Sequence, residues 1–304
     1  MYNHPYPTPI RDYGVQHNMQ PEWPGTRVIL AFGAGMNMDF RDKVIVVTGG
    51  ASGIGQATAR EFARMHGAVA IFDRDARGGE TAAEISGAGG TAEFFQVDLG
   101  VAAQVESAVE QAAERFGGVD ILANVAGIQR YGTAVTTTGA EWDETMDANV
   151  RSAFLASKYA IPHMLRRGGG AIVIVGSVQS VTAQRNSMAY VISKHALLGL
   201  ARSMAVDFGV DNIRVNCVCP GAIDTPLLRW AASLDTQPER VIDACHKLSL
   251  FGRMGRPEEI ARVIAFLASE LASFITGAAI FADGGLMTPT GGTANQEAGT
   301  GGAR

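Results

Sequence analysis

The feature that most constrains the fold of this chain is a regular alternation between short β-type segments and Ala-rich helical stretches. Such an alternation predicts a parallel sheet, because a helix must return the chain to the start of each new strand. The segments are apolar runs, as expected when helices cover both faces of a sheet. We therefore predict an α/β fold with a doubly wound, parallel, seven-stranded sheet. The seven predicted strands are Lys43–Thr48, Val69–Asp73, Ala92–Val97, Ile121–Val125, Ala171–Gly176, Ile213–Val218 and Ala278–Ala282.

The chain has 304 residues, of which 47% are hydrophobic, so it can bury one large core. This length fits a single α/β domain of about 250 residues with tails better than two domains. Residues 1–38 are rich in proline and lack a periodic apolar pattern, which predicts a flexible N-terminal arm. A start of translation at Met36 or Met38 is the alternative. We expect the folded domain over residues 39–287 and a disordered, Gly/Thr-rich tail over residues 288–304.

Charge and hydropathy argue against two classes of partner. The net charge is -5 and the Lys and Arg residues are scattered, so we expect no nucleic-acid partner. No apolar run approaches the roughly 18 residues of a membrane span, and no basic segment followed by an apolar one opens the chain. The sequence therefore predicts a cytoplasmic protein with no membrane partner.

The cysteines and histidines show no sign of a metal site. The six His residues lack metal-ligand spacing, so we predict no metal. Three cysteines, Cys217, Cys219 and Cys245, cannot all pair with one another. Cys217 and Cys219 are expected to point to opposite faces of their strand as buried packing residues.

A glycine-rich turn, Thr48–Gly55, follows the first strand and opens the next helix. Gly49, Gly53 and Gly55 allow a tight turn and let the backbone approach a pyrophosphate, whose charge would meet free N–H groups and the helix dipole. The alternative is a glycine-rich turn that binds no ligand. In its position between a strand and a helix, the turn indicates a dinucleotide site.

Asp73 ends the second predicted strand, near the distance from the turn at which an acidic residue accepts hydrogen bonds from the adenosine ribose. A 2′-phosphate at this place would meet a like charge, which favours NAD over NADP. Arg74 could partly accommodate a phosphate, and Asp75 is a rival for the acidic role. Asp73 is preferred because it is the first polar residue after the apolar strand.

Polar and glycine residues recur where the other strands end. Because the carboxyl ends of parallel strands share one edge of a sheet, these residues should meet at one ligand site. Asp98 has the alternative role of a helix cap. Besides Asp73 and the glycine-rich turn, the strand-end residues are Asp98, Asn124, Ser177, Pro220 and Gly221.

Ser177, Tyr190 and Lys194 can carry out alcohol and carbonyl chemistry without a metal. A phenol titrates near pH 10, so Tyr190 needs a pKa shift of about three units to act as a base near neutral pH. Lys194, four residues further along a helix, lies on the same face and would stabilise the phenolate. Ser177 could hold the substrate oxygen, although a lone serine at a strand end is more often a cap.

With these motifs the chain resembles the short-chain dehydrogenase/reductase family, over about residues 39–287. The resemblance implies a Rossmann fold, a nicotinamide cofactor, Tyr190 as general acid/base, and Lys194 as the residue that binds the ribose and lowers the tyrosine's pKa. It also implies Ser177 as substrate orienter and Asn149 as holder of a relay water. The chain departs from the family pattern at Val125, where a second Asn is usual, and at Gly176, where Ser is more frequent.

The resemblance also implies the residues that bind the cofactor, which we expect to be NAD. They are Gly49, Ser52, Gly53, Ile54, Gly55, Asp73, Asp98, Leu99, Asn124, Ala126, Gly127, Tyr190, Lys194, Pro220, Gly221, Ile223 and Thr225.

The helix after Tyr190 carries a wider apolar surface than one buried stripe needs, which together with the resemblance predicts a homotetramer. Deeper burial of this helix within its own subunit is the alternative. The substrate loop should lie between Thr225 and Gly252. Polar neighbours suggest a hydroxylated substrate. The expected pocket residues are Gln129, Arg130, Gln179, Gln184, Arg185, Asn186, Leu227, Leu228 and Trp230.

The predicted function is hydride transfer between a nicotinamide cofactor, preferably NAD, and a small secondary alcohol or ketone such as a sugar or polyol. One alternative is a 3-oxoacyl-carrier-protein-type reductase, against which Asp73 and the acidic balance argue. Another is a catalytically silent nucleotide-sensing or scaffold protein. The presence of Ser177, Tyr190, Lys194 and Asn149 argues against that second alternative.

Overall fold

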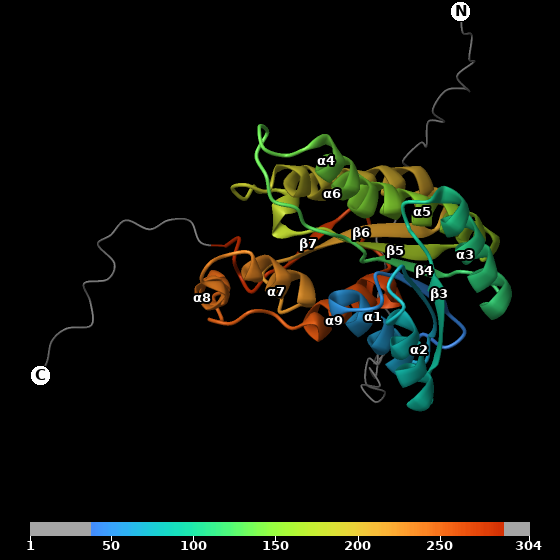
Figure 1. Cartoon of the computed structure of the whole chain (residues 1–304). Coiled ribbons are helices and arrows are strands. Elements are labelled where there is room, and N and C mark those ends of the chain that lie inside the picture. The colour runs from blue at the N-terminus through green and yellow to red at the C-terminus, as the bar shows by residue number, and fades with distance from the viewer. Residues whose placement is uncertain (1–37, 289–304) are drawn as a thin grey trace, which may run out of the picture. The chain divides into compact units, whose positions relative to one another are not determined.

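The computed structural model describes residues 38–288, which form one seven-stranded parallel sheet (Figure 1). The predicted arm and tail lie outside the described residues, apart from Met38 and Thr288. The strand order is β3-β2-β1-β4-β5-β6-β7 and every neighbouring pair is parallel, which confirms the predicted doubly wound sheet. The strands are β1 (Val44–Thr48), β2 (Ala68–Asp73), β3 (Thr91–Gln96), β4 (Ile121–Asn124), β5 (Gly170–Val175), β6 (Ile213–Pro220) and β7 (Ala279–Ala282).

Helices cover both faces of the sheet, and two short helices lie beyond one end of it (Figure 1). One face carries α1 (Gly53–Arg64), α2 (Gly78–Gly87) and α9 (Pro257–Ala268). The other carries α3 (Ala102–Phe116), α5 (Ser152–Arg166) and α6 (Met188–Phe208), with α4 (Gly139–Met146) beside α6. The outlying helices are α7 (Pro226–Ser233) and α8 (Pro238–Leu248). None of the helices between residues 38 and 288 combines the length and apolar character needed to cross a bilayer.

The sheet separates two hydrophobic cores, and alternate strand residues enter each of them. In β1, Val46 packs with α3 and α5, whereas Ile45 and Val47 pack with α1 and α9. All five residues of β1 are buried, because helices cover both sides of this central strand.

The same alternation corrects the expectation for the two cysteines of β6. Cys217 and Cys219 are both buried, but they share one face of the sheet, and their Sγ atoms lie 3.9 Å apart. Side chains alternate with a period of two, so residues two apart must point the same way. The prediction of opposite faces was therefore wrong, whereas the prediction of buried packing residues is confirmed.

A buried carboxylate fastens the opposite edge of the sheet, where the strands begin. Asp120 accepts a hydrogen bond from the backbone N–H of Val44 (2.8 Å) and from Nε of Arg167 (2.7 Å). Its side chain is only 7% exposed, so water cannot replace these donors. The contact joins the starts of β1 and β4 to the end of α5.

Asp120→Ala is expected to lower the free energy of unfolding by about 2 kcal/mol, because it leaves a buried N–H group and the guanidinium of Arg167 without their acceptor. Urea unfolding of the purified protein measures the change. Glu84→Ala, which removes the exposed partner of Arg60, is the matched control and should cost less than about 1 kcal/mol. Equal losses for the two variants would contradict a special role of Asp120.

Candidate active site

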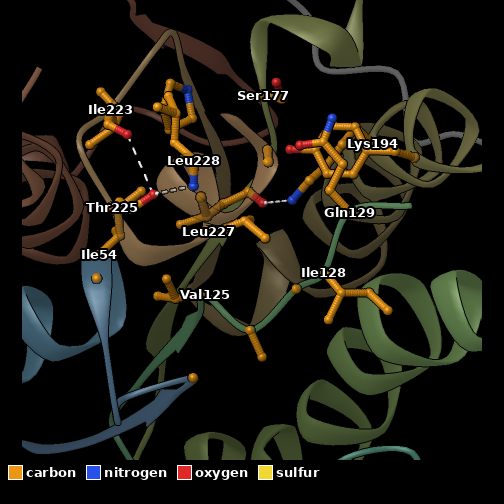
Figure 2. Close-up of a pocket in the computed structure, with 18 of the residues that line it drawn as sticks. Ile54, Val125, Ile128, Gln129, Ser177, Lys194, Ile223, Thr225, Leu227 and Leu228 are labelled. Carbon is orange, nitrogen blue, oxygen red and sulfur yellow. Dashed lines mark hydrogen bonds between the residues drawn. The ribbon is translucent and has the colours of Figure 1, made fainter. Parts of the chain in front are cut away.

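A cavity of about 780 Å³ runs along the carboxyl ends of the strands. The residues that line it come from separate strand ends and from α7 and α8 (Figure 2). Of the predicted catalytic and cofactor-binding residues, Asn124 and Asn149 alone lie behind the wall. The cavity is lined by Gly49, Ser52, Gly53, Ile54, Gly55, Asp73, Asp98, Leu99, Ala126, Gly127, Ser177, Tyr190, Lys194, Pro220, Gly221, Ile223 and Thr225, among others.

The glycine-rich turn leaves the first N–H groups of α1 open to the cavity. Ser52 begins the helix but its side chain forms no cap bond, and the first helical bond is donated by Gln56. The N–H groups of the first turn, Gly53–Gly55, therefore remain free within the described part of the chain, as a pyrophosphate requires. Gly55 cannot be replaced, because a Cβ there would lie 2.0 Å from the carbonyl oxygen of Gly49.

Asp73 faces the same end of the cavity and also holds the turn in place. One carboxylate oxygen accepts from the N–H of Ala51 (3.0 Å) and the other from the N–H of Asp75 (3.0 Å). The rival carboxylate, Asp75, does not line the cavity and is paired with Arg77. The hydrogen bond from Arg77 lowers the pKa of Asp75 to about 2. Arg74 does line the cavity, beside Asp73.

Ser177 and Tyr190 meet at the other end of the cavity. Ser177 follows β5 and its Oγ accepts the N–H of Gln179 at 3.1 Å, so the serine also caps the short turn Val178–Ser180. The cap interpretation is therefore confirmed, and the same serine also faces the cavity, where its role as substrate orienter remains a prediction. Tyr190 lies in the first turn of α6 and lines the same cavity, where Ser177 acts to lower the pKa of its phenol.

The glycine before Ser177 is required by what packs behind it. A Cβ on Gly176 would lie 2.6 Å from Oγ of Ser180 and 2.8 Å from Sγ of Cys217. Ser180 is itself engaged, since its Oγ accepts the N–H of Ser177 at 3.2 Å. The departure from the family pattern at this position thus has a packing cause in β6.

Burial shifts the pKa values of both catalytic candidates toward their neutral forms. Burial raises the pKa of Tyr190 to about 12, although its hydrogen bond with Ser177 acts to lower it. Burial lowers the pKa of Lys194 to about 8, against the influence of the Cys217 and Cys219 thiols. The downward shift of the Tyr190 pKa that we expected from Lys194 is therefore not supplied by the protein alone.

Lys194 nevertheless sits where the sequence placed it, one helical turn beyond Tyr190. Its Nζ lies 5.5 Å from the centre of the Tyr190 ring and donates to the carbonyl of Val175 at 2.9 Å, a bond drawn in Figure 2. That carbonyl ends β5 and gives the buried ammonium its hydrogen-bond partner.

The two asparagines lie behind the wall and hold its loops. Asn149 is buried in a π-helical segment, Asp147–Arg151; its Oδ1 accepts the N–H of Ile128 (2.7 Å) and its Nδ2 donates to the carbonyl of Ile128 (3.0 Å). Nδ2 also donates to Oγ of Ser193 at 2.9 Å. Asn124 is buried and donates to Oγ of Ser157 at 3.1 Å. Asn149 thus fastens the loop after β4 to α6, close to Lys194.

Asp98 and Thr225 lie after β3 and β6, and each accepts a hydrogen bond from a nearby backbone N–H group. Asp98 does not cap α3, which begins after Val101; its Oδ1 instead accepts the N–H of Gly100 at 2.9 Å. Thr225 caps α7, since its Oγ1 accepts the N–H of Leu228 at 3.2 Å (Figure 2).

The substrate half of the cavity differs in part from the prediction. Gln129, Gln179, Gln184, Leu227 and Leu228 line it as expected, but Arg130, Arg185, Asn186 and Trp230 do not. The helix α8 lies within the predicted substrate loop, Thr225–Gly252, but no periodicity marks which of its residues face the cavity, because this depends on tertiary packing. Lining residues that the prediction did not name include Tyr131, Thr182, Val241, Cys245, Leu248 and Leu286.

Lys194→Met should make the cofactor-free protein more stable at pH 7, by roughly 2 kcal/mol, because the variant buries no ammonium. The folded-state pKa of Lys194 is about 8 and its usual value is 10.5, so the unfolded chain binds more protons between these two pH values. The advantage of the variant should therefore be largest below pH 8 and shrink as the pH rises toward 10.5. Urea unfolding at pH 7 and pH 10 measures it, and a variant less stable than the wild type at pH 7 would disprove this cost of burial.

Comparisons with known proteins agree with this geometry. Residues 49–287 match the family model described as enoyl-(acyl carrier protein) reductase. The chain is 38% identical to 2-(S)-hydroxypropyl-CoM dehydrogenase 3 of Xanthobacter autotrophicus, over 83% of this chain and 99% of that protein. It is also 38% identical to 2,5-dichloro-2,5-cyclohexadiene-1,4-diol dehydrogenase of Sphingobium indicum, over 81% of this chain and 98% of the relative.

A solved structure shares the fold as well. The ligand-free aldohexose dehydrogenase of Thermoplasma acidophilum superposes with a TM-score of 0.76 and is 36% identical, covering 83% of this chain and 97% of its own. The family match, the identities over nearly the whole length of each relative, and the shared fold lead to one conclusion. The chain belongs to the short-chain dehydrogenase/reductase family of oxidoreductases.

Proposed function

We propose that this protein is an NAD-dependent dehydrogenase that interconverts a small, polar secondary alcohol and its ketone. The observation that carries the proposal is the composition of one continuous cavity. Its first end holds the open N–H groups of α1 and the Asp73 carboxylate, and its second end holds Ser177, Tyr190 and Lys194. A nucleotide and an alcohol bound at these two ends would share the cavity.

The residues at the first end fit a dinucleotide. The N–H groups of Gly53–Gly55 would bind the pyrophosphate and the carboxylate of Asp73 would accept the ribose hydroxyls. When bound, the nicotinamide supplies the hydride chemistry and, in its oxidised form, a positive charge. The side chains of the protein would orient the substrate and transfer its proton.

The chain's own groups would orient the substrate and move its proton. Ser177 and Tyr190 would both hydrogen-bond the substrate oxygen, which fixes the carbon that bears it. The Tyr190 phenol would donate that oxygen's proton in reduction and receive it in oxidation. Lys194 would stabilise the phenolate, and Asn149 would hold the loop beside it and a relay water. Because burial raises the pKa of Tyr190 to about 12, the phenol stays protonated near neutral pH in the cofactor-free protein, and the further positive charge of an oxidised nicotinamide would lower this pKa.

The lining of the second end supports a polar substrate with an apolar face. Gln129, Gln179 and Gln184 offer amides, and Leu227 and Leu228 offer an apolar wall opposite. Oε1 of Gln179 is buried with no hydrogen-bond partner in the described chain, so a hydroxyl donor would satisfy it. The relatives named for a diol and an aldohexose are consistent with this class of substrate.

We also propose a cytoplasmic homotetramer with a single folded domain over residues 39–287. Leu197, Leu198, Ala201 and Met204 of α6 are buried within the subunit, so the apolar width of this helix supports assembly less than we expected. Support comes instead from Phe274, which is fully exposed at 103% beside β7.

Tyr190→Phe should reduce turnover by about 10³-fold while leaving cofactor binding unchanged, because only the proton-carrying oxygen is lost. A screen that follows NADH formation over sugars, polyols, hydroxy acids and steroids identifies the best alcohol for this measurement. Tyr131→Phe removes another phenol that lines the cavity and should keep most of the turnover. Wild-type rates in Tyr190→Phe would refute the acid/base role, and a clear preference for steroids would refute the polar substrate.

NAD should be preferred over NADP by at least about tenfold in kcat/KM, because Asp73 would place a carboxylate against the additional phosphate. Asp73→Asn keeps an acceptor for the N–H of Ala51 but removes the charge, so it should narrow the preference. Asp75→Asn is the control, since Asp75 does not line the cavity and should leave the preference unchanged. Stronger activity of the wild type with NADP than with NAD would overturn the assignment.

A further inference from the structure

Three side chains outside the cavity join its two substrate walls. Nε and Nη2 of Arg130 donate to the two carboxylate oxygens of Glu144 at 2.9 and 2.7 Å. Nη1 donates to the carbonyl of Gln129 at 3.0 Å, so all three guanidinium nitrogens have acceptors. The same guanidinium lies over the ring of Trp230, 5.7 Å from its centre. We call Arg130, Glu144 and Trp230 the latch.

The latch connects segments whose neighbouring residues face the substrate. Gln129 and Tyr131 flank Arg130 and line the cavity. On α7, Ala231 follows Trp230 and Leu228 lies two positions before it, and both line the cavity as well. Arg130 and Trp230 themselves do not line it. Their contact therefore spans the rim between the loop after β4 and α7.

The segment that contains Trp230 buries few side chains, although Arg229 pairs with Asp224 and Nδ1 of His246 accepts the N–H of Met254. We call residues 226–248, which form α7 and α8, the lid. Ala232 is the one buried residue of α7, and α8, which the structure describes in full, has none. Both helices still line the cavity, through residues such as Leu227 and Val241. A segment with so little burial opens at low cost in free energy, so a single rim contact can control it.

We propose that the latch positions the lid over the substrate. Arg130 is the central residue, because it connects Glu144 of α4 to Trp230 of α7. Glu144 fixes the guanidinium by a bidentate pair, and Trp230 rests on it through a cation–π contact. Arg130 lies outside the cavity and its charge is paired with Glu144, so it would not contact the substrate directly. Its effect on the substrate would come from the position of the lid. The kinetic part of this inference rests on the proposed function, whereas its structural part does not.

Hydrogen exchange of the cofactor-free, full-length protein tests the latch without any substrate. Arg130→Gln should speed amide exchange in residues 226–248 by about two- to fivefold, as expected for the loss of one partly exposed cation–π contact. Trp230→Leu should do the same, and the double variant should add little, since both changes remove one contact. Arg115→Gln is the matched control, because Arg115 combines an ion pair to Glu93 with a stacking contact on Phe116 far from the lid.

Steady-state kinetics with the best alcohol from the screen provide the second measurement. Arg130→Gln should raise KM for the alcohol by about two- to fivefold without lowering kcat and without changing the affinity for the cofactor. Unchanged exchange in the lid of both single variants, or additive effects in the double variant, would overturn the latch. If the wild type oxidises none of the alcohols, the proposed function is wrong. The hydrogen-exchange measurement would still test whether the latch holds the lid.

Discussion

All seven strands of the sheet run in the same direction, and the site depends on this arrangement. Parallel pairing brings every carboxyl end to one edge, so each of the strands β1 to β6 delivers its next residue to the same cavity. The first helix also begins there, and its open N–H groups face the cavity because Gly55 packs against the carbonyl of Gly49. Polar residues that are far apart in the sequence, such as Asp73 and Ser177, are thereby placed along one continuous surface without any contact between their own elements.

The end of the cavity that holds Tyr190 and Lys194 disfavours the charged forms of both side chains. Lys194 is buried and Tyr190 is half-buried in the cavity wall, and desolvation shifts the pKa of each toward the uncharged form. The carbonyl of Val175 gives the ammonium a hydrogen bond, which reduces the cost of burying it. The pKa values of Tyr190 and Lys194 should change strongly when a charged ligand enters the cavity, because partly buried charges are screened less than exposed ones. Burying these two side chains lowers the stability of the fold, and the same burial makes their pKa values sensitive to the charge of a bound ligand.

The sequence predicted every strand end to within two residues, because apolar runs covered on both faces leave a clear pattern. Residues at the strand ends, such as Asp73 and Ser177, were predicted well for the same reason: topology alone brings them together. The substrate wall was predicted less well. Whether Gln129 faces the cavity and Arg130 faces away depends on the path of one loop, and no periodicity encodes that path. The error at Cys219 was one of geometry, since residues two apart on a strand share a face.

Gly176 illustrates how packing restricts the routes by which this chain can change over generations. The space that a side chain would need there is filled by Ser180 and by Cys217, which belongs to a different strand. A larger residue at position 176 is tolerated more easily when position 217 has first become smaller, because that order passes through a cavity that costs stability but keeps the fold, whereas the opposite order begins with a clash. Oγ of Ser180 must shift in either case. The two positions are thus epistatic: descendants of this sequence can acquire the more usual serine more readily by one order of substitutions than by the other.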